Sequence, residues 1–196
     1  MTPRNAESDP IERYLRAAER AQQQGVDTAP AALATADPEG RPSVRIVLLR
    51  QVDPRGFVFY TNYGSRKARE LLKNPRAAIC QHWPALEEQI RVEGSIERVT
   101  AAESDAYFAG RPRDSQIGAW ASEQSQDLES RGILEARYAE MQAKFDGRPV
   151  ARPPFWGGFR IVASQMEFWY GKAGRLHERE VFVKTAGGWS ARWLFP

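Results

Sequence analysis

The stretch AALATADPEGRPSVRIVLLRQVDPRGFVFYT, residues 31–61, contains three short apolar segments separated by two turn signals. The segments are rich in small, β-branched or aromatic residues, as strands are. The turn signals, Asp37–Gly40 and Asp53–Gly56, each combine Asp, Pro and Gly, which favour tight chain reversals. Short strands joined by tight turns pair antiparallel, so this stretch predicts an antiparallel meander. Its strands are Ala31–Ala36, Ser43–Leu49 and Phe57–Thr61.

Further strand and helix signals lie on both sides of this meander. Strands are predicted at Ala77–Trp83, Gln89–Val99, Trp156–Val162, Gln165–Tyr170, Glu180–Lys184 and Trp189–Phe195. Helices are predicted at residues 10–23, at Ser65–Asn74, from a capping box at Thr100 to about Ala109, and at Leu128–Phe145. Helices do not alternate with strands, which disfavours the alternative of a parallel α/β sheet. The pattern therefore predicts a mainly β protein with helices (α+β), built on an antiparallel barrel or sandwich.

The predicted domain organisation is simple. Residues 1–25 form an N-terminal tail and helix, and residues 26–196 form a single domain. The tail, residues 1–8, is polar and is predicted to be disordered. No internal repeat or long linker divides the rest of the chain.

Composition argues against several classes of protein. The 28 basic and 25 acidic residues give a net charge of +3, and their even mixing predicts no nucleic-acid-binding face. One cysteine permits neither an intrachain disulfide nor a cysteine-based metal cluster. His82 and His177 lie far apart and predict no metal site. The N-terminus lacks a secretory pattern, and no apolar run approaches the ~20 residues of a membrane span, so we expect a soluble, cytoplasmic protein.

Four groups of basic and hydroxyl side chains remain as candidates for chemistry. The first is Arg45–Arg50, a strand with an arginine at each end. The second is Tyr60–Lys67, where a strand ends and a helix begins. The N–H groups of a helix start, a serine hydroxyl and two cations suit a phosphate group. The alternative is an ordinary helix cap followed by a solvated helix face.

The third group is Tyr107 together with Arg111–Trp120. The side chains of Tyr107, Arg111 and Ser115 are close enough in sequence to converge on a second phosphate. Arginine suits this role because its guanidinium donates two parallel hydrogen bonds. The alternative is a loop in which Arg111 and Asp114 pair with each other.

The fourth group is Glu167–Tyr170 followed by Arg175–Arg179. If Arg175–Arg179 is a strand, Arg175, His177 and Arg179 share one face, because side chains in a strand alternate with period two. The alternative is an exposed strand face lined with cations. Two candidate phosphate sites with nearby aromatic residues predict two phosphorylated ligands, one of them a flat cofactor.

At these positions the sequence resembles the pyridoxine/pyridoxamine 5'-phosphate oxidase family. The similar segments occur in family order and are Arg45–Leu49, Tyr60-Thr61, Ser65–Lys67, Arg111–Trp120, Phe155–Arg160 and Arg175–Arg179. The Arg111–Trp120 segment distinguishes this oxidase within the wider group of FMN-binding split-barrel proteins. The resemblance implies an antiparallel split β-barrel and a homodimer with FMN at the subunit interface.

The resemblance also implies roles for individual residues. FMN contacts, some reaching across from the other subunit, are implied for Arg45, Ile46, Val47, Leu48, Leu49, Arg50, Tyr60, Thr61, Arg66, Lys67, Gln89, Gln124, Ser125, Trp169 and Arg179. Contacts with the substrate's phosphate are implied for Arg50, Tyr107, Arg111 and Ser115. Catalytic contacts at the pyridine ring are implied for Arg175 and His177.

The implied reaction oxidises pyridoxamine or pyridoxine 5'-phosphate to pyridoxal 5'-phosphate, with O2 reduced to H2O2. Two positions depart from the family pattern: Arg50 replaces a usual lysine, and Trp193 replaces a common arginine. An FMN oxidase acting on another ring is one alternative. A flavin or pyridoxal-phosphate carrier without turnover and a nucleic-acid-binding barrel are two others.

Overall fold

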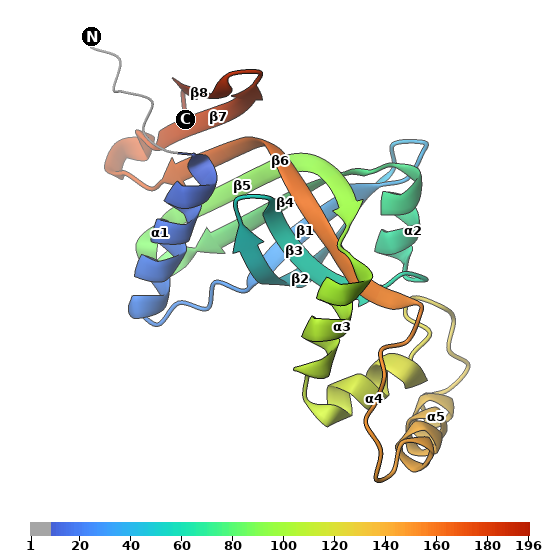
Figure 1. Cartoon of the computed structure of the whole chain (residues 1–196). Helices are drawn as coiled ribbons and strands as arrows, with labels where there is room; N and C mark the ends of the chain where they lie inside the picture. The colour runs from blue at the N-terminus through green and yellow to red at the C-terminus, as the bar shows by residue number, and fades with distance from the viewer. Residues whose placement is uncertain (1–8) are drawn as a thin grey trace.

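The computed structural model of the protein describes residues 9–196, so the predicted disorder of residues 1–8 lies outside the described residues. Six antiparallel strands form a closed barrel (Figure 1). They are β1 (Pro30–Ala36), β2 (Pro42–Asp53), β3 (Gly56–Asn62), β4 (Arg76–Trp83), β5 (Glu88–Arg98) and β6 (Trp156–Tyr170). Their order is β3-β2-β1-β4-β5-β6, and β3 pairs with β6 to close the barrel. The predicted antiparallel barrel is confirmed, and the parallel α/β alternative is excluded.

The remaining elements are added to this barrel. A hairpin of β7 (Glu178–Thr185) and β8 (Gly188–Trp193) continues the sheet beyond β6. The helices are α1 (Pro10–Gln23), α2 (Arg66–Lys73), α3 (Ala101–Ala109), α4 (Arg113–Ala121) and α5 (Arg131–Lys144). Helices α3, α4 and α5 lie together at one end of the barrel, and α1 lies near the opposite end, close to β7 and β8 (Figure 1).

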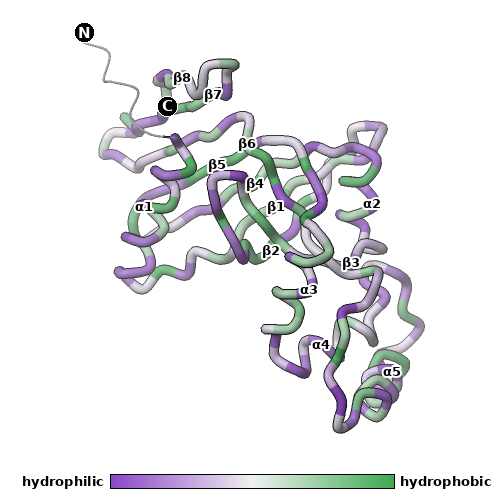
Figure 2. The backbone as a smooth tube through the Cα atoms, in the orientation of Figure 1, coloured by the Kyte–Doolittle hydropathy of each residue, from purple (hydrophilic) through white to green (hydrophobic). Residues whose placement is uncertain are grey.

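Alternating side chains divide each barrel strand between core and surface. The burial of β1 and β4 alternates residue by residue, and hydrophobic and hydrophilic residues alternate along the strands in Figure 2. The barrel interior and the underside of α1 form one core. A second, smaller core of Phe108, Ile117, Val150 and Trp156 lies under α3 and α4.

The predicted break between Trp156–Val162 and Gln165–Tyr170 is wrong, because both segments belong to the single strand β6. The register against β5 shifts so that Ser164 has no direct partner, as in a β-bulge. Before the bulge β6 pairs with β3, and after it β6 pairs with β7. The bulge therefore allows one strand to serve two neighbours.

Two helix predictions also need correction. Helix α5 begins at Arg131 rather than at Leu128. Helix α4 covers most of the Arg111–Trp120 segment, where no helix was predicted, and ends at Ala121. Its N-cap is Pro112, which makes no side-chain capping bond. The capping box at Thr100 is confirmed at the start of α3.

A buried ion network fixes the start of α3 against the barrel. Arg160 in β6 is only 1% exposed. Its guanidinium contacts Asp53 at the end of β2 and Glu103 in α3, each at 2.9 Å. Because buried charges are stable only when paired, this network holds α3 and the β2–β3 turn against β6.

The β2–β3 turn gives a direct test of barrel closure. A Cβ on Gly56, whose φ is +136°, would lie 2.1 Å from the carbonyl oxygen of Ile161. Gly40, in the β1–β2 turn, has φ +79° but no atom within 4 Å of the equivalent position. We expect Gly40→Ala to lower the free energy of unfolding by about 1–2 kcal/mol, from backbone strain alone. Gly56→Ala should cost about 3 kcal/mol or more, because strain and collision add.

Denaturant unfolding of both variants measures the difference. Equal losses for the two glycine variants would contradict the close approach of the β2–β3 turn to β6.

Candidate active site

A cavity of about 900 Å³ lies beside β2 and β3 and is bordered by α3 and α4. Residues of three predicted groups line it, far apart in sequence but together in space. They include Ile46, Val47, Leu48, Arg50, Tyr60, Thr61, Lys67, Tyr107, Arg111, Ser115 and Gln124. Its volume is at the upper end of the range for small-molecule sites, which leaves room for two ligands.

One end of the cavity contains Lys67, in the first turn of α2. The α2 N-cap is Ser65, whose hydroxyl accepts a hydrogen bond from the Ala68 N–H. The Lys67 Nζ donates to Thr61 Oγ1 and to Gln124 Oε1, each at 3.2 Å. Burial, and then the charge of Arg45, lowers the pKa of Lys67 to about 8. An anion at this position would restore the lost stabilisation of the ammonium.

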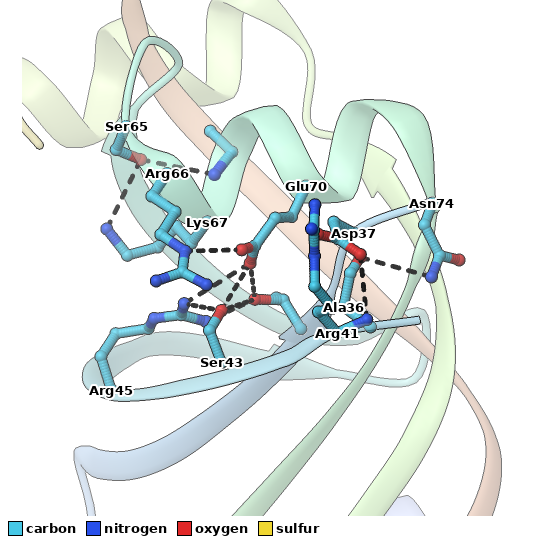
Figure 3. A network of polar contacts seen from close by, with 12 residues as sticks. Ala36, Asp37, Arg41, Ser43, Arg45, Ser65, Arg66, Lys67, Glu70 and Asn74 are labelled. Carbon is cyan, nitrogen blue, oxygen red and sulfur yellow. Dashed lines mark hydrogen bonds and ion pairs between the residues drawn. The ribbon is translucent and has the colours of Figure 1, made fainter. Parts of the chain in front are cut away.

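Arg45 and Arg66 lie beside this end of the cavity without lining it (Figure 3). Both face Glu70: Arg66 Nε donates to Glu70 Oε1 at 2.8 Å, and Arg45 Nη2 lies 3.5 Å from Glu70 Oε2. Arg45 also donates to Thr35 Oγ1 at 2.5 Å and to the Ser43 hydroxyl. Three cations therefore surround the start of α2 and suit a phosphate.

The other end of the cavity is formed by α3 and α4. The rings of Tyr60, Tyr107 and Trp156 are mutually stacked, with Tyr60 and Tyr107 centroids 4.0 Å apart. The guanidinium of Arg111 lies 4.7 Å from the centroid of Trp156. The stack thus supports Arg111 from one side.

Arg111 has a buried nitrogen, Nη1, without a hydrogen-bond partner among the described residues. A buried unpaired donor costs free energy, so its presence at a cavity wall favours an anionic ligand. Burial lowers the pKa of Arg111, and the charge of Arg50 lowers it further. Arg111 and Asp114 do not form the ion pair that the alternative interpretation expects. Asp114 instead forms a side-chain hydrogen bond with Tyr138.

The fourth predicted group lies elsewhere. Gln89 in β5 is opposite Trp169 in β6, and Trp169 is opposite Arg179 in β7. The Trp169 and His177 rings have centroids 4.7 Å apart, and Arg179 forms two hydrogen bonds with the buried Glu167. None of these residues lines the cavity.

The proposed strand over Arg175–Arg179 is wrong. Arg175 ends a short 3₁₀ turn. Of the Arg175–Arg179 segment, only Glu178 and Arg179 belong to β7. The φ angles of Gly174 and Arg175 are +67° and +60°, so the chain turns there and period-two alternation does not apply. The His177 ring still lies close to the Trp169 ring. Its Nδ1 accepts a hydrogen bond from the Lys172 N–H at 3.1 Å, which connects the two ends of this turn.

Two further expected contacts, Leu49 and Ser125, do not line the main cavity. Leu49 points into the barrel core, as strand alternation requires next to Leu48 and Arg50. Ser125 lines a smaller neighbouring pocket with Gln124. The φ of Ser125 is +70°.

From the sequence, Glu70 was missed, and no individual role was assigned to Trp156 and Gly158, although both lie in the Phe155–Arg160 segment that resembles the family. The i,i+4 spacing of Arg66 and Glu70 is a recognisable ion-pair signal. No comparable signal marks Gly158, where a Cβ would lie 2.8 Å from the Tyr60 ring. The glycine therefore permits the position of Tyr60 in the aromatic stack.

Within residues 9–196, no group of three or more His, Cys, Asp or Glu residues could hold a metal ion. In the same part of the chain, no helix is both long and apolar enough to cross a membrane.

Comparisons with known proteins agree with this geometry. Residues 18–145 match the family described as pyridoxamine 5'-phosphate oxidase. Residues 156–196 match the C-terminal dimerisation region of pyridoxine 5'-phosphate oxidase, which supports a homodimer.

Individual relatives cover nearly the whole chain. A pyridoxine/pyridoxamine 5'-phosphate oxidase from Myxococcus xanthus is 53% identical, over 96% of this chain and 92% of its own. A pyridoxine/pyridoxamine 5'-phosphate oxidase from Anaeromyxobacter dehalogenans is 52% identical, over 99% of this chain and 98% of its own.

Solved structures share the fold. PhzG from Burkholderia lata 383, in complex with tetrahydrophenazine-1-carboxylic acid, superposes with a TM-score of 0.93 at 32% identity, covering 100% of this chain and 98% of its own. A pyridoxamine 5'-phosphate oxidase-related FMN-binding protein from Nostoc punctiforme is 19% identical and superposes with a TM-score of 0.76. The match covers 97% of this chain and 100% of that protein's chain. From its sequence matches and its cavity, the chain belongs to the pyridoxine/pyridoxamine 5'-phosphate oxidase family.

Proposed function

We propose that the protein oxidises pyridoxamine 5'-phosphate and pyridoxine 5'-phosphate to pyridoxal 5'-phosphate, with O2 reduced to H2O2. With the amine substrate, water supplies the aldehyde oxygen and ammonia is released. FMN is the cofactor. The observation that carries the proposal is the pair of anion-binding ends in one cavity, Lys67 at one end and the unpaired Arg111 Nη1 at the other. Two separate phosphates, one on the cofactor and one on the substrate, match this arrangement.

The residues around the start of α2 fit the FMN phosphate. Lys67, Arg66 and Arg45 supply positive charge, and Thr61 and Gln124 supply neutral partners. The exposed side chains of Ile46 and Leu48 offer apolar cavity wall for the flat ring. When bound, FMN supplies the hydride acceptor that the amino acids lack.

The α3–α4 end fits the phosphate of the substrate. Arg111, Tyr107 and Ser115 all line this end, and Arg50 lines the same cavity. Anchoring the phosphate fixes the position of the reacting carbon, and such positioning can lower the barrier of a reaction substantially. Arg50, where the family usually has lysine, keeps the charge and adds a second guanidinium to this site.

The fourth group is proposed to complete the site from the partner subunit. Arg175 and His177 would contact the substrate ring, and Gln89, Trp169 and Arg179 the cofactor. Val44 and Ile46, on the outer face of β2, are 69% and 65% exposed. An apolar row of this kind favours burial in an interface, and Ile46 also lines the cavity. A second copy on this face would bring its own Arg175 and His177 to the cavity.

A related oxidase acting on another ring is the second candidate. The structure of PhzG contains a tetrahydrophenazine carboxylic acid, a ligand with a carboxylate in place of a phosphate. The cluster of Arg50, Tyr107, Arg111 and Ser115 in this chain favours the larger phosphate charge.

H2O2 release tests the proposed function directly. With FMN and O2 present, pyridoxamine 5'-phosphate should give H2O2 and pyridoxal 5'-phosphate in equal amounts. Unphosphorylated pyridoxamine should react far more slowly, because the Arg111 end has nothing to bind. Equal rates with both substrates, or no H2O2 from either phosphorylated substrate, would contradict the proposal.

Arg111 and Arg175 should have separable roles. We expect Arg111→Ala to raise the KM for pyridoxamine 5'-phosphate by about 10- to 100-fold with a smaller change in kcat, since a charged hydrogen bond is worth about 1.5–3 kcal/mol. Arg175→Ala should lower kcat/KM by about 100-fold with FMN still bound. Steady-state kinetics and flavin absorbance measure both. Normal turnover by Arg175→Ala would remove this residue from the site.

Lys67 should make FMN affinity depend on pH. The free ammonium has a pKa of about 8, and a bound phosphate would raise it. FMN affinity should therefore be constant between pH 7 and about 8, then fall by up to tenfold per pH unit above that. Fluorescence titrations with FMN measure this slope, and riboflavin, which lacks the phosphate, should not show it. A flat FMN profile to pH 10, or the same slope in Lys67→Met, would contradict the assignment.

A further inference from the structure

Glu70 is the carboxylate that pairs with two of the three cations at the start of α2, Arg45 and Arg66. It lies in α2, one turn after Arg66, and is only 6% exposed. The network in Figure 3 places Glu70 between Arg66 on one side and Ser43 and Arg45 on the other. It lies next to the proposed phosphate site without lining the cavity.

Every contact of Glu70 holds it as an anion. Arg66 Nε donates to one carboxylate oxygen at 2.8 Å. The hydroxyl of Ser43 donates to the second carboxylate oxygen, Oε2, at 2.6 Å. The hydroxyl of Thr35 donates to the same oxygen. These contacts and the charge of Arg45 outweigh burial and lower the pKa of Glu70 to about 2. The carboxylate is therefore ionised at any pH at which the protein works.

The same hydroxyl groups connect Glu70 to Arg45. Arg45 donates to Thr35 and Ser43, whose protons are directed toward Glu70. Arg66 has only its Nε hydrogen-bonded among the described residues. Its terminal amino groups thus remain available for a ligand while Glu70 holds the rest of the guanidinium.

The cations repel one another when no ligand is present. The charge of Arg45 contributes to the lowered pKa of Lys67, and the charge of Arg66 contributes to the lowered pKa of Arg45. A negative charge close to the cations relieves this repulsion. Glu70 supplies that charge permanently, whereas a phosphate supplies it only when the cofactor is bound.

We propose that Glu70 is a built-in counter-ion that stabilises the empty phosphate site and thereby weakens FMN binding. The inference rests on the proposed assignment of this site to the FMN phosphate. Glu70 attracts the cations in the apoprotein but repels a phosphate bound to them. Removing its charge should destabilise the apoprotein more than the FMN complex, and by thermodynamic linkage that difference must appear as tighter FMN binding.

This sign separates a counter-ion from a positioning residue. If Glu70 acted mainly by holding Arg45 and Arg66 in place, its loss would weaken FMN binding. If Glu70 were only a structural ion pair, its loss would destabilise the apoprotein and the complex equally.

The test compares Glu70→Gln, which keeps the shape and removes the charge, with the wild-type chain. We expect FMN to bind Glu70→Gln roughly fivefold more tightly or better, the lower end of ordinary coupling between sites. The melting temperature of the apoprotein should fall by about 2–4 °C more than that of the FMN complex. Riboflavin should bind both proteins equally. Glu70→Asp, which keeps the charge, should stay close to wild type in FMN affinity.

Glu88→Gln is the matched control. Glu88 is also a buried carboxylate paired with an arginine, since Arg20 Nη2 lies 2.7 Å from its Oε1, but it does not line the cavity and makes no contact with the cations around α2 among the described residues. Its loss should lower both melting temperatures equally and leave FMN affinity unchanged.

The FMN affinity of Glu70→Gln distinguishes a counter-ion from a positioning residue or a structural ion pair. Unchanged or weaker FMN binding by Glu70→Gln would overturn the counter-ion role, as would failure of this variant to fold with saturating FMN. Folding only when FMN is present would support it. If the wild-type chain itself binds riboflavin as tightly as FMN, the proposed phosphate site fails. If it discriminates between them but Glu70→Gln changes nothing, only the counter-ion fails.

Discussion

The pairing of β3 with β6 is the interaction on which both the barrel and the cavity depend. It closes the sheet and sets Tyr60 opposite Gly158 and Thr61 opposite Gly157. Because Gly158 has no side chain, the Tyr60 ring can stack with Trp156 at this seam, and Gly157 leaves room for the Tyr63 hydroxyl. The same strand end leads into α2, and α3 is tied to β6 by Arg160. Closure of the barrel therefore brings the two basic ends of the cavity together.

Charge is distributed unequally between the two ends. Around α2, the cations share a resident carboxylate, Glu70, so part of their charge is already compensated. At the α3–α4 end, Arg111 is supported by the Trp156 ring and has no such partner at its Nη1. An end with its own counter-ion remains stable when empty, and an end without one gains more from a ligand. The α2 end is therefore stable before its ligand binds, whereas the α3–α4 end has an unpaired donor that a ligand would satisfy.

Much of the fold followed from local sequence patterns. The Asp-Pro-x-Gly turns and the apolar segments around them predicted β1, β2 and β3, and the Thr100 capping box predicted the start of α3. Turn and cap signals act over a few residues, so they can be recognised in a single sequence. The continuity of β6 through Ser164 could not be predicted, because a bulge depends on which strands lie alongside. Helix α4 was missed because its first turn has no side-chain cap.

Local sequence signals also predicted part of the candidate site. Arg111, Lys67 and Tyr107 stood out as residue types suited to phosphate, and they line one cavity. Glu70 and Gly158 act through neighbours that are distant in sequence, so their roles became visible only in three dimensions.

We propose that each active site is built from two subunits, with Arg111 from one and Arg175 from the other. Mixed dimers of Arg111→Ala and Arg175→Ala chains test it directly, since in each mixed dimer one site would have both arginines intact. At pyridoxamine 5'-phosphate concentrations far below KM, where Arg111→Ala sites also turn over slowly, co-expression in equal amounts should restore about one quarter of the wild-type activity, because half of the dimers are mixed and each has one intact site of two. Activity no higher than that of the two parent variants would show that both arginines act within one subunit, and would contradict the account.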